Sequence, residues 1–120
     1  MIARAAGGLA QVLLADDDPG VRRAMVTSLS RAGFEVTAVD DGAPAIALAG
    51  SSPHAIVLVD LHMRTGGLAV IRHYKQLYGA GVYCAVLSGE GDEATREACL
   101  AAGADEVFCK PFPAVDLRRR

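Results

Sequence analysis

Short apolar runs alternate regularly with longer segments whose apolar residues recur at helical spacing, and this alternation constrains the fold most. Residues 55–59 are continuously apolar, which is typical of a strand covered on both faces. The apolar positions of the first helical segment are Val21, Ala24, Met25, Ser28 and Leu29. The expected strands are 11–15, 35–39, 55–59, 82–87 and 106–109, and the expected helices are 19–32, 44–49, 68–78, 92–102 and 113–120.

Five successive strand–helix units predict the fold class. Each strand must return by a right-handed crossover to pair in parallel with an earlier one, so helices cover both faces of the sheet. The 120 residues therefore predict one doubly wound α/β domain with a five-stranded parallel sheet. Ligands of such sheets bind outside the carboxyl ends of the strands, where the direction of winding reverses.

Charge and cysteine content exclude several classes of protein. Without the three arginines at 118–120, nine basic residues face fourteen acidic ones, a net charge of −5 that argues against non-specific nucleic-acid binding. No apolar run approaches the roughly 18 residues that cross a membrane. Cys84, Cys99 and Cys109 show no CxxC spacing and are expected to be small buried groups in a cytoplasmic protein. Residues 1–10 are expected to form a loose N-terminal extension.

Polar residues follow four of the five expected strands. Asp16 and Asp17 follow the first, Asp60 the third, Ser88 the fourth and Lys110 the fifth. Three carboxylates at one edge repel one another unless a cation joins them, and Mg²⁺ is a hard ion that binds carboxylate and phosphate oxygens. A lysine and a hydroxyl suit the oxygens of a transferring phosphoryl group, and a carboxylate can be its nucleophile. The pattern indicates Mg²⁺-dependent phosphoryl chemistry.

Each of these residues also has a simpler structural explanation. Asp18 stands before a proline and is expected to cap the first helix, while Asp60 could merely begin a loop. Ser88 precedes a glycine, as turn residues do, and Lys110 could be an ordinary strand exit. Their joint occurrence at four strand ends favours a functional site.

Four segments in a fixed order carry a resemblance to a known family. Together they resemble the receiver domain of bacterial two-component response regulators, and the likeness spans residues 11–117. These segments are 12–19, 57–63, 86–89 and 103–112. The resemblance implies a flavodoxin-like (βα)5 fold with strand order 2-1-3-4-5 over residues 11–120, with a last helix that is short, as in a truncated chain.

The resemblance implies that Asp60 accepts a phosphoryl group from a phosphohistidine. The donor would be a sensor histidine kinase or a histidine phosphotransfer protein. Asp16 and Asp17 would hold Mg²⁺ together with Asp60 and the backbone carbonyl of His62. The domain would then switch a protein-interaction surface for an effector that the sequence does not name, without being an enzyme beyond its self-catalysed phosphoryl transfer and slow autodephosphorylation.

Further roles follow from the same resemblance. Lys110 would pair with the phosphoryl oxygens, and its peptide bond to Pro111 is expected to be cis. Ser88 would move to hydrogen-bond those oxygens. We expect the side chain of His62 to be exposed and, with Glu90, to modulate the access of water.

The sequence departs from the family pattern at two places. Arg64 stands where the family usually has a proline, and Gly67 arrives one residue early, so the loop after Asp60 is altered. Val107 occupies the position of the family's switch aromatic, and Phe108 should point to the opposite face of the strand. A switch by rotation of an aromatic ring is therefore not expected.

Signalling is instead expected to pass through Ser88 and the loop 89–91 to the start of helix 92–102. Small side chains bury little area, so displacing this helix should cost little free energy. The helix is expected to pack through Ala94, Ala98, Ala101 and Ala102.

Two alternatives from other functional classes stay open. Asp16 and Asp18 form an Asp-x-Asp motif like that of haloacid dehalogenase-type phosphatases. That family needs a late acidic pair, whereas only Asp116 follows the lysine, and Asp60 would be unexplained. A receiver-like binding module that works without phosphorylation is the second alternative, which Val107 favours and the acidic residues oppose.

Overall fold

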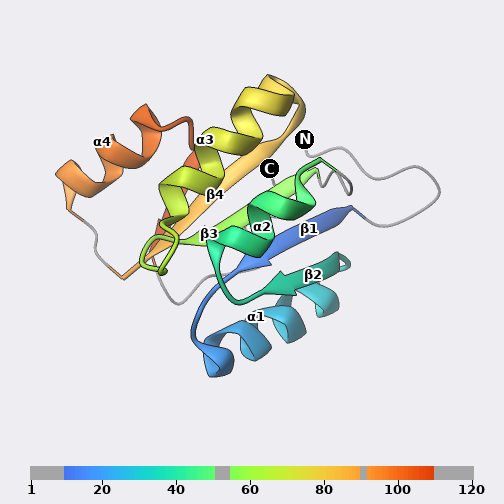
Figure 1. Cartoon of the computed structure of the whole chain (residues 1–120). Helices are drawn as coiled ribbons and strands as arrows, with labels where there is room; N and C mark the ends of the chain where they lie inside the picture. The colour runs from blue at the N-terminus through green and yellow to red at the C-terminus, as the bar shows by residue number, and fades with distance from the viewer. Residues whose placement is uncertain (1–9, 51–54, 90–91, 110–120) are drawn as a thin grey trace.

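The computed structural model describes residues 10–50, 55–89 and 92–109 (Figure 1). Their strands form one parallel sheet in the order β2-β1-β3-β4-β5. This arrangement confirms the predicted fold class and strand order. The strands are β1 (Gln11–Ala15), β2 (Glu35–Val39), β3 (Ile56–Asp60), β4 (Tyr83–Ser88) and β5 (Glu106–Cys109).

The described helices lie on both faces of the sheet (Figure 1). Helix α1 packs on one face, and α2, α3 and α4 pack on the other. The extension predicted at the N-terminus, apart from Ala10, and the helix predicted at 113–120 lie outside the described residues. The helices are α1 (Pro19–Arg31), α2 (Gly42–Leu48), α3 (Gly67–Tyr78) and α4 (Glu93–Ala101), and a 3-10 turn spans Gly79–Gly81.

Two apolar layers enclose the sheet. Leu13 faces α2 and α3, whereas its neighbours Val12 and Leu14 face α1, as the alternation of side chains along a strand requires. Every residue of β3 is buried. Coverage on both faces explains why the first four residues of this strand form a continuous apolar run in the sequence.

Helix α1 begins as its sequence predicts. The Asp18 carboxylate accepts hydrogen bonds from the backbone N–H groups of Gly20 and Val21, and a proline occupies the first helical position. The helix buries Met25 and Leu29. Ala24 and Ser28 are exposed, so their predicted place on the buried face was wrong. The face toward the sheet is completed instead by the half-buried Val21 and Val26.

The packing of α4 also differs from the prediction. Ala94, Ala98 and Ala101 are exposed and Ala102 is half-buried, whereas Cys99 is the buried residue of this helix. The helix is turned so that Cys99 faces the sheet, and the half-buried Thr95 and Ala102, four and three residues away, lie on the same side of the helix. A helix with one buried side chain still has little contact area holding it.

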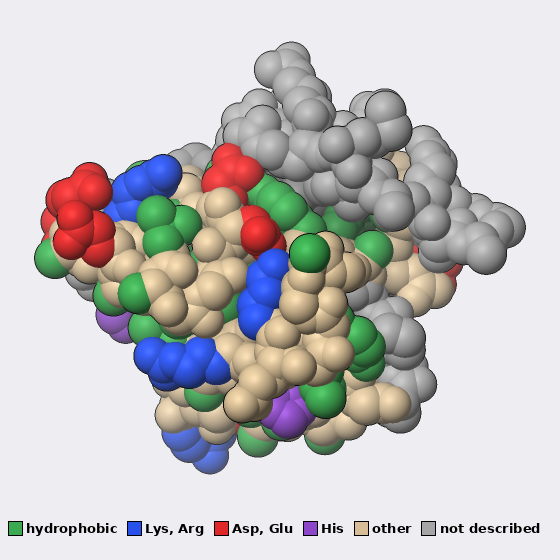
Figure 2. All heavy atoms as spheres, turned by 90° about the horizontal axis from the view of Figure 1, so that it is seen from above, with side chains coloured by type: hydrophobic (Ala, Val, Ile, Leu, Met, Phe, Trp, Pro, Cys, Tyr) green, Lys and Arg blue, Asp and Glu red, His purple; other side chains and the backbone are tan. Residues whose placement is uncertain are grey.

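The outward side of α4 carries charged residues. Asp92, Glu93 and Glu97 are exposed, as is Arg96. Figure 2 shows acidic side chains gathered at the end of the molecule where this helix lies. Because charged side chains remain solvated in any position of the helix, they do not oppose its displacement.

One cysteine contradicts its predicted burial. Cys84 and Cys99 are buried, but Cys109 is exposed because it ends β5, the edge strand of the sheet. Burial raises the pKa of the Cys84 thiol to about 12 and also raises the pKa of Cys99. Both buried thiols therefore act as neutral apolar groups, as expected.

None of the helices in the described part of the chain is both long and apolar enough to span a lipid bilayer.

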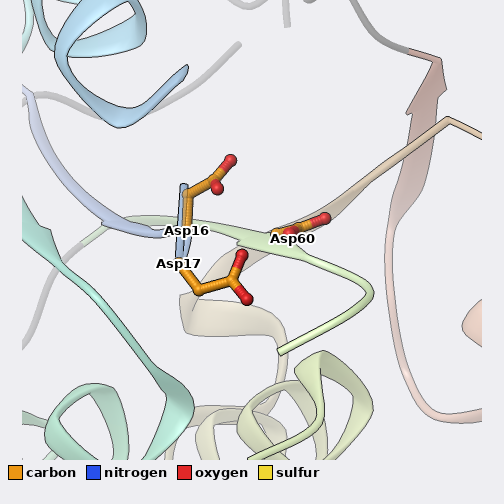
Figure 3. Close-up of side chains that lie close together, drawn as sticks. All are labelled: Asp16, Asp17 and Asp60. Atoms are coloured by element: carbon orange, nitrogen blue, oxygen red, sulfur yellow. The ribbon is translucent and has the colours of Figure 1, made fainter. Parts of the chain in front are cut away.

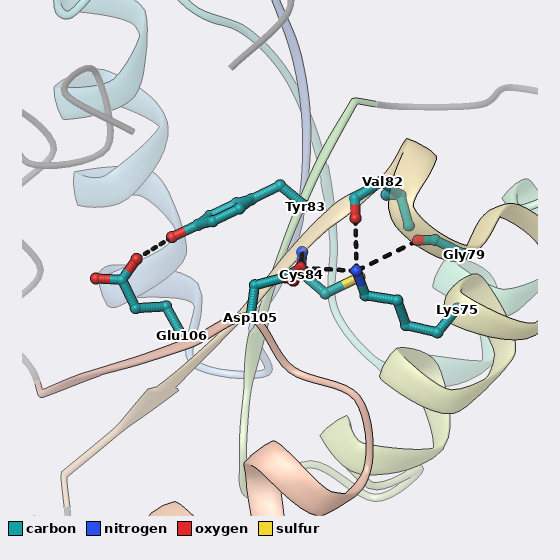
Figure 4. A network of polar contacts seen from close by, with 7 residues as sticks. All are labelled: Lys75, Gly79, Val82, Tyr83, Cys84, Asp105 and Glu106. Atoms are coloured by element: carbon teal, nitrogen blue, oxygen red, sulfur yellow. Dashed lines mark hydrogen bonds and ion pairs between the residues drawn. The ribbon is translucent and has the colours of Figure 1, made fainter. Parts of the chain in front are cut away.

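A lysine near the end of α3 joins that helix to the beginnings of β4 and β5 (Figure 4). The Lys75 ammonium donates hydrogen bonds to the carbonyl oxygens of Val82 at 2.7 Å and Gly79 at 3.3 Å. It also forms an ion pair with Asp105 at 2.7 Å, and the same carboxylate oxygen accepts from the Cys84 N–H at 2.8 Å. These contacts lie at the amino end of β4, away from the polar strand ends.

Replacing Lys75 by methionine is expected to lower the free energy of unfolding by about 1–3 kcal/mol, because carbonyl groups lose a charged donor. Asp105→Asn should cost less than about 1 kcal/mol, since the ion pair is partly exposed and the amide oxygen can still accept from Cys84. Urea unfolding of both variants measures the difference. Equal losses would show that the ion pair, not the carbonyl contacts, carries the stabilisation.

Candidate functional site

Three carboxylates meet at the carboxyl edge of the sheet. Asp16 and Asp17 directly follow β1, and Asp60 is the last residue of the adjacent strand β3. One carboxylate oxygen from each residue lies within 4.8 Å of the others. Figure 3 shows the three side chains projecting beyond the ends of these two strands. The topology therefore brings together the carboxylates that the sequence placed at strand ends.

The three carboxylates differ in their exposure to solvent. Asp16 is fully buried and Asp60 is 7% exposed, whereas Asp17 is exposed. The Asp16 N–H donates to the carbonyl of Val39 in β2, and its carboxylate accepts from the Asp18 N–H at 3.0 Å. The site is therefore anchored in the sheet on one side and open to solvent at Asp17.

An arginine from α1 fixes the chain at the first carboxylate. The Arg22 guanidinium donates to the backbone carbonyl of Asp16 at 2.8 Å, from six residues further along the chain. Sequence reasoning missed this residue. Its position one turn into the helix that follows the acidic pair was the available signal.

The donor set fits a hard divalent cation. Three carboxylates within 4.8 Å, two of them buried, offer only oxygen ligands and repel one another without a positive charge between them. This is the only group of three potential metal-ligating side chains found in the part of the chain that the structure describes. Its partly open side leaves room for water and phosphate oxygens, as Mg²⁺ sites require.

Ser88 lies next to this cluster in the sheet. It is the fully buried last residue of β4, and β4 pairs with β3 so that Asp60 is in register with Leu87. The Leu61 N–H continues the pairing by donating to the Leu87 carbonyl at 3.0 Å. Ser88 therefore stands at the carboxyl end of the strand next to the one that ends at Asp60. Lys110 with its proline peptide bond, and Glu90, lie outside the described residues.

The remaining predicted residues occupy the loop after β3 and the edge strand. His62 is exposed in that loop, as expected. Val107 is half-buried on the face of α2, α3 and α4, while Phe108 is buried on the opposite face. The prediction that Phe108 points away from the switch position is confirmed.

A second contact that sequence reasoning missed holds the loop after Asp60. The Asp41 carboxylate accepts a hydrogen bond from the Thr65 N–H at 2.8 Å, across 24 positions of the chain. This bond is the largest cause that lowers the pKa of Asp41 below its usual value. No local sequence pattern signals a contact between residues this far apart.

The fold and the site together define a class of protein. A doubly wound parallel sheet of order 2-1-3-4-5 reverses its winding between β1 and β3, and the acidic cluster lies at this reversal. The molecule is therefore an α/β domain with an acidic, cation-compatible site at its switch point.

Comparison with known proteins gives the family. Residues 12–120 match the response regulator receiver domain family, and the chain belongs to it. It is a receiver domain of two-component response regulators. The match decides against the haloacid dehalogenase-type alternative.

The relatives include whole regulators and isolated receivers. The response regulator MprA of Mycobacterium tuberculosis is 37% identical over 113 residues, which cover 92% of this chain and 48% of MprA. The chain thus spans about half the length of the curated relatives it matches.

Two of the solved structures that are similar to this chain are described with a metal ion. One is the receiver domain of the sensor histidine kinase PA1611 from Pseudomonas aeruginosa, described with a magnesium ion in its active-site cleft. It has a TM-score of 0.82 and 26% identity, and the match covers 93% of both chains. The other is a response regulator from Burkholderia pseudomallei with a phosphorylated aspartic acid, a calcium ion and citrate. It has a TM-score of 0.82 and 26% identity, over 91% of this chain and 64% of that one.

Proposed function

We propose that Asp60 accepts a phosphoryl group from the phosphohistidine of a sensor histidine kinase or a histidine phosphotransfer protein. The observation that carries this proposal is a buried carboxylate at the end of β3, within 4.8 Å of two further carboxylates. The similar regulator from Burkholderia pseudomallei, which contains a phosphorylated aspartic acid, supports it.

The transfer balances as a displacement at phosphorus. An oxygen of the Asp60 carboxylate bonds to phosphorus while the bond from phosphorus to the histidine nitrogen breaks. The electron pair of the broken bond stays on the imidazole, which takes up a proton. The product is an acyl phosphate on Asp60. Hydrolysis by water later returns the carboxylate and releases inorganic phosphate.

The site residues divide the work of binding and orienting. Asp16, Asp17, Asp60 and the backbone carbonyl of His62 would hold Mg²⁺, which supplies positive charge to neutralise the phosphoryl oxygens when bound. The Ser88 hydroxyl donates a hydrogen bond to those oxygens, and the Lys110 ammonium forms an ion pair with them. The side chains of His62 and Glu90 modulate how readily water reaches the acyl phosphate.

Substitution of the exposed carboxylate should weaken the cation site. Asp17→Asn is expected to lower the affinity for Mg²⁺ about tenfold or more, because one unit of negative charge is lost a few ångströms from the ion. Relief of repulsion in the metal-free site leaves the fold intact. Titration followed by backbone NMR signals of residues 16, 17 and 60–62 measures the change.

Asp40, an exposed residue that directly follows β2, provides a matched control for that titration. Asp40→Asn removes the same charge from the solvent-exposed residue that follows β2 and should leave the affinity within about twofold, since Asp40 lies outside the carboxylate cluster and provides no ligand. If Asp17→Asn bound Mg²⁺ as tightly as the wild type, the assignment of the metal ligands would be wrong.

The output passes from Ser88 through residues 89–91 to the start of α4. Val107 has one stiff β-branched torsion and no ring to rotate, and α4 buries a single side chain. Beryllofluoride, a phosphoryl mimic, should therefore change amide hydrogen exchange in residues 88–102. Changes confined to the loop after Asp60 would place the signalling surface elsewhere.

The partners follow from this chemistry. The chain acts in the cytoplasm as a receiver, residues 11–120. It docks with a phosphohistidine protein, and an effector domain or protein reads its switched surface. The chain itself contacts neither nucleic acid nor membrane.

A second function is favoured by one observation. Val107, half-buried where the family has an aromatic residue, suits a binding module that works without phosphorylation. Incubation with acetyl phosphate and Mg²⁺ distinguishes the two functions. The proposed function expects one added phosphoryl group per chain, measured by mass spectrometry, and no labelling when a chelator is present from the start. An unmodified wild type would support the binding module.

A further inference from the structure

The loop between β3 and α3 lacks the proline that the family usually has there. Residues 61–66 connect the proposed phosphoacceptor to α3, and Arg64 stands at the proline's place. An arginine leaves the backbone free to adopt more conformations than a proline does. The contacts that hold this loop must therefore come from elsewhere in the fold.

Asp41, between β2 and α2, contacts the loop from outside it. Its carboxylate oxygen accepts a hydrogen bond from the Thr65 N–H at 2.8 Å. A bond between a carboxylate and a backbone N–H is charge-assisted and stronger than a neutral one. The depressed pKa of Asp41, caused first by this bond, is consistent with a carboxylate that stays ionised against the loop.

The backbone of the loop packs closely against the residue after Asp41. A Cβ atom at Gly42 would lie 2.6 Å from the Thr65 carbonyl oxygen and 3.0 Å from the Thr65 Cβ. Only glycine leaves space for this approach. The Thr65 N–H is thus bonded to the Asp41 carboxylate, while the Thr65 carbonyl and side chain pack against the bare backbone of Gly42.

The helix that follows Asp41 is itself fixed to α3. The Tyr74 hydroxyl donates to the Ala45 carbonyl at 3.0 Å, and the Tyr78 hydroxyl donates to the carbonyl of Ala49. Positions 41, 45 and 49 are spaced by four residues, so α2 contacts the loop and α3 along one side. These hydrogen bonds fix α2 relative to α3, so Asp41 has a defined position next to the loop.

We infer that Asp41 is a positioning residue that holds the loop after Asp60 in the conformation the phosphoacceptor site needs. This inference rests on the proposed function of Asp60 and deepens it. The loop contains His62, whose backbone carbonyl is a proposed cation ligand. The conformation of the loop therefore determines the fraction of molecules in which all the proposed ligands are in place. Apparent affinity for a cation falls in proportion to the fraction of molecules in the competent conformation.

The first test measures the loop in the metal-free protein. Asp41→Ala is expected to raise the hydrogen-exchange rate of the Thr65 amide about tenfold or more, since the N–H loses its acceptor. Asp41→Asn keeps an acceptor oxygen and should restore most of the protection. Asp40→Ala removes the neighbouring exposed carboxylate and should behave as the wild type. Unchanged exchange in Asp41→Ala would overturn the inference.

The second test measures function in the same variants. Asp41→Ala should lower both the affinity for Mg²⁺ and the rate of labelling by acetyl phosphate by about threefold to tenfold, because the charged hydrogen bond that orders the loop is lost. Asp41→Asn should recover most of both, and Asp40→Ala should change neither. An equal loss in Asp40→Ala would overturn the inference by assigning the effect to surface charge.

The two proposals fail in distinguishable ways. If the wild type is never labelled, the proposed function fails, and the exchange of Thr65 still reports whether Asp41 orders the loop. If the wild type and Asp41→Ala are labelled equally fast and bind Mg²⁺ equally well, the positioning role fails and the proposed function stands.

Discussion

Replacing Asp60 by alanine is expected to reduce labelling by acetyl phosphate to background. The reagent needs a carboxylate nucleophile, and Asp60 is the one that ends the central strand β3 and neighbours Ser88 in the sheet. Mass spectrometry of wild type and variant, each with Mg²⁺, measures the loss directly. Beryllofluoride binding, followed by NMR, should disappear with it.

A second variant separates loss of the nucleophile from loss of the fold. Asp60→Asn keeps the size and hydrogen-bonding capacity of the side chain but cannot form an acyl phosphate, so it should also remain unlabelled. Both variants should unfold at the same urea concentration as the wild type or a higher one, because removing one of three clustered carboxylates relieves repulsion. Labelling that persisted in Asp60→Asn would move the acceptor to Asp16 or Asp17.

The fold could be predicted because a strand that helices cover on both faces consists mainly of apolar residues. Each residue of β3 is buried, and its first four residues form an uninterrupted apolar run. The end of that strand was harder to place. Asp60 belongs to β3 since its backbone is paired with Leu87, and pairing of the backbone does not depend on the polarity of the side chain.

The orientation of short helices was less predictable. The alanines of α4 lie on several sides of the helix, so its sequence shows no clear apolar face. The face that is buried is the one that contains Cys99. In α2 the proline marked the first turn, but the helix begins two residues earlier, at Gly42. Gly42 is the residue that approaches Thr65 closely, a tertiary constraint that local pattern does not express.

The acidic cluster was predictable from topology, whereas its supports were not. Parallel strands end at one edge, so residues that follow β1 and β3 must meet there, and Asp16, Asp17 and Asp60 do. Arg22 and Asp41 act on backbone groups of other segments. Any side chain of suitable length can reach a backbone group, so the identity of the partner is decided by the packed fold.

Gly67→Ala should be among the most disruptive single substitutions near the site. A Cβ atom at Gly67, the first residue of α3, would lie 2.5 Å from the backbone oxygen of Asp60 and 3.2 Å from a methyl group of Val59. The nearest atom belongs to the backbone of the phosphoacceptor, so relief requires moving either β3 or α3. Overpacking of this kind typically costs about 1–3 kcal/mol of unfolding free energy.

The adjacent glycine makes the test specific to that close approach. Gly66 has a φ of −57°, and a Cβ atom there would have nothing within 4 Å, so Gly66→Ala should change stability by less than about 0.5 kcal/mol. Urea unfolding measures stability, and acetyl phosphate labelling measures whether Asp60 has moved. We expect Gly67→Ala to be both less stable and slower to label, because the strain falls on the carbonyl of the acceptor itself. Two alanine variants with equal stability and equal labelling would show that α3 can withdraw from β3 without cost, and the tight junction between them would then have no role in placing Asp60.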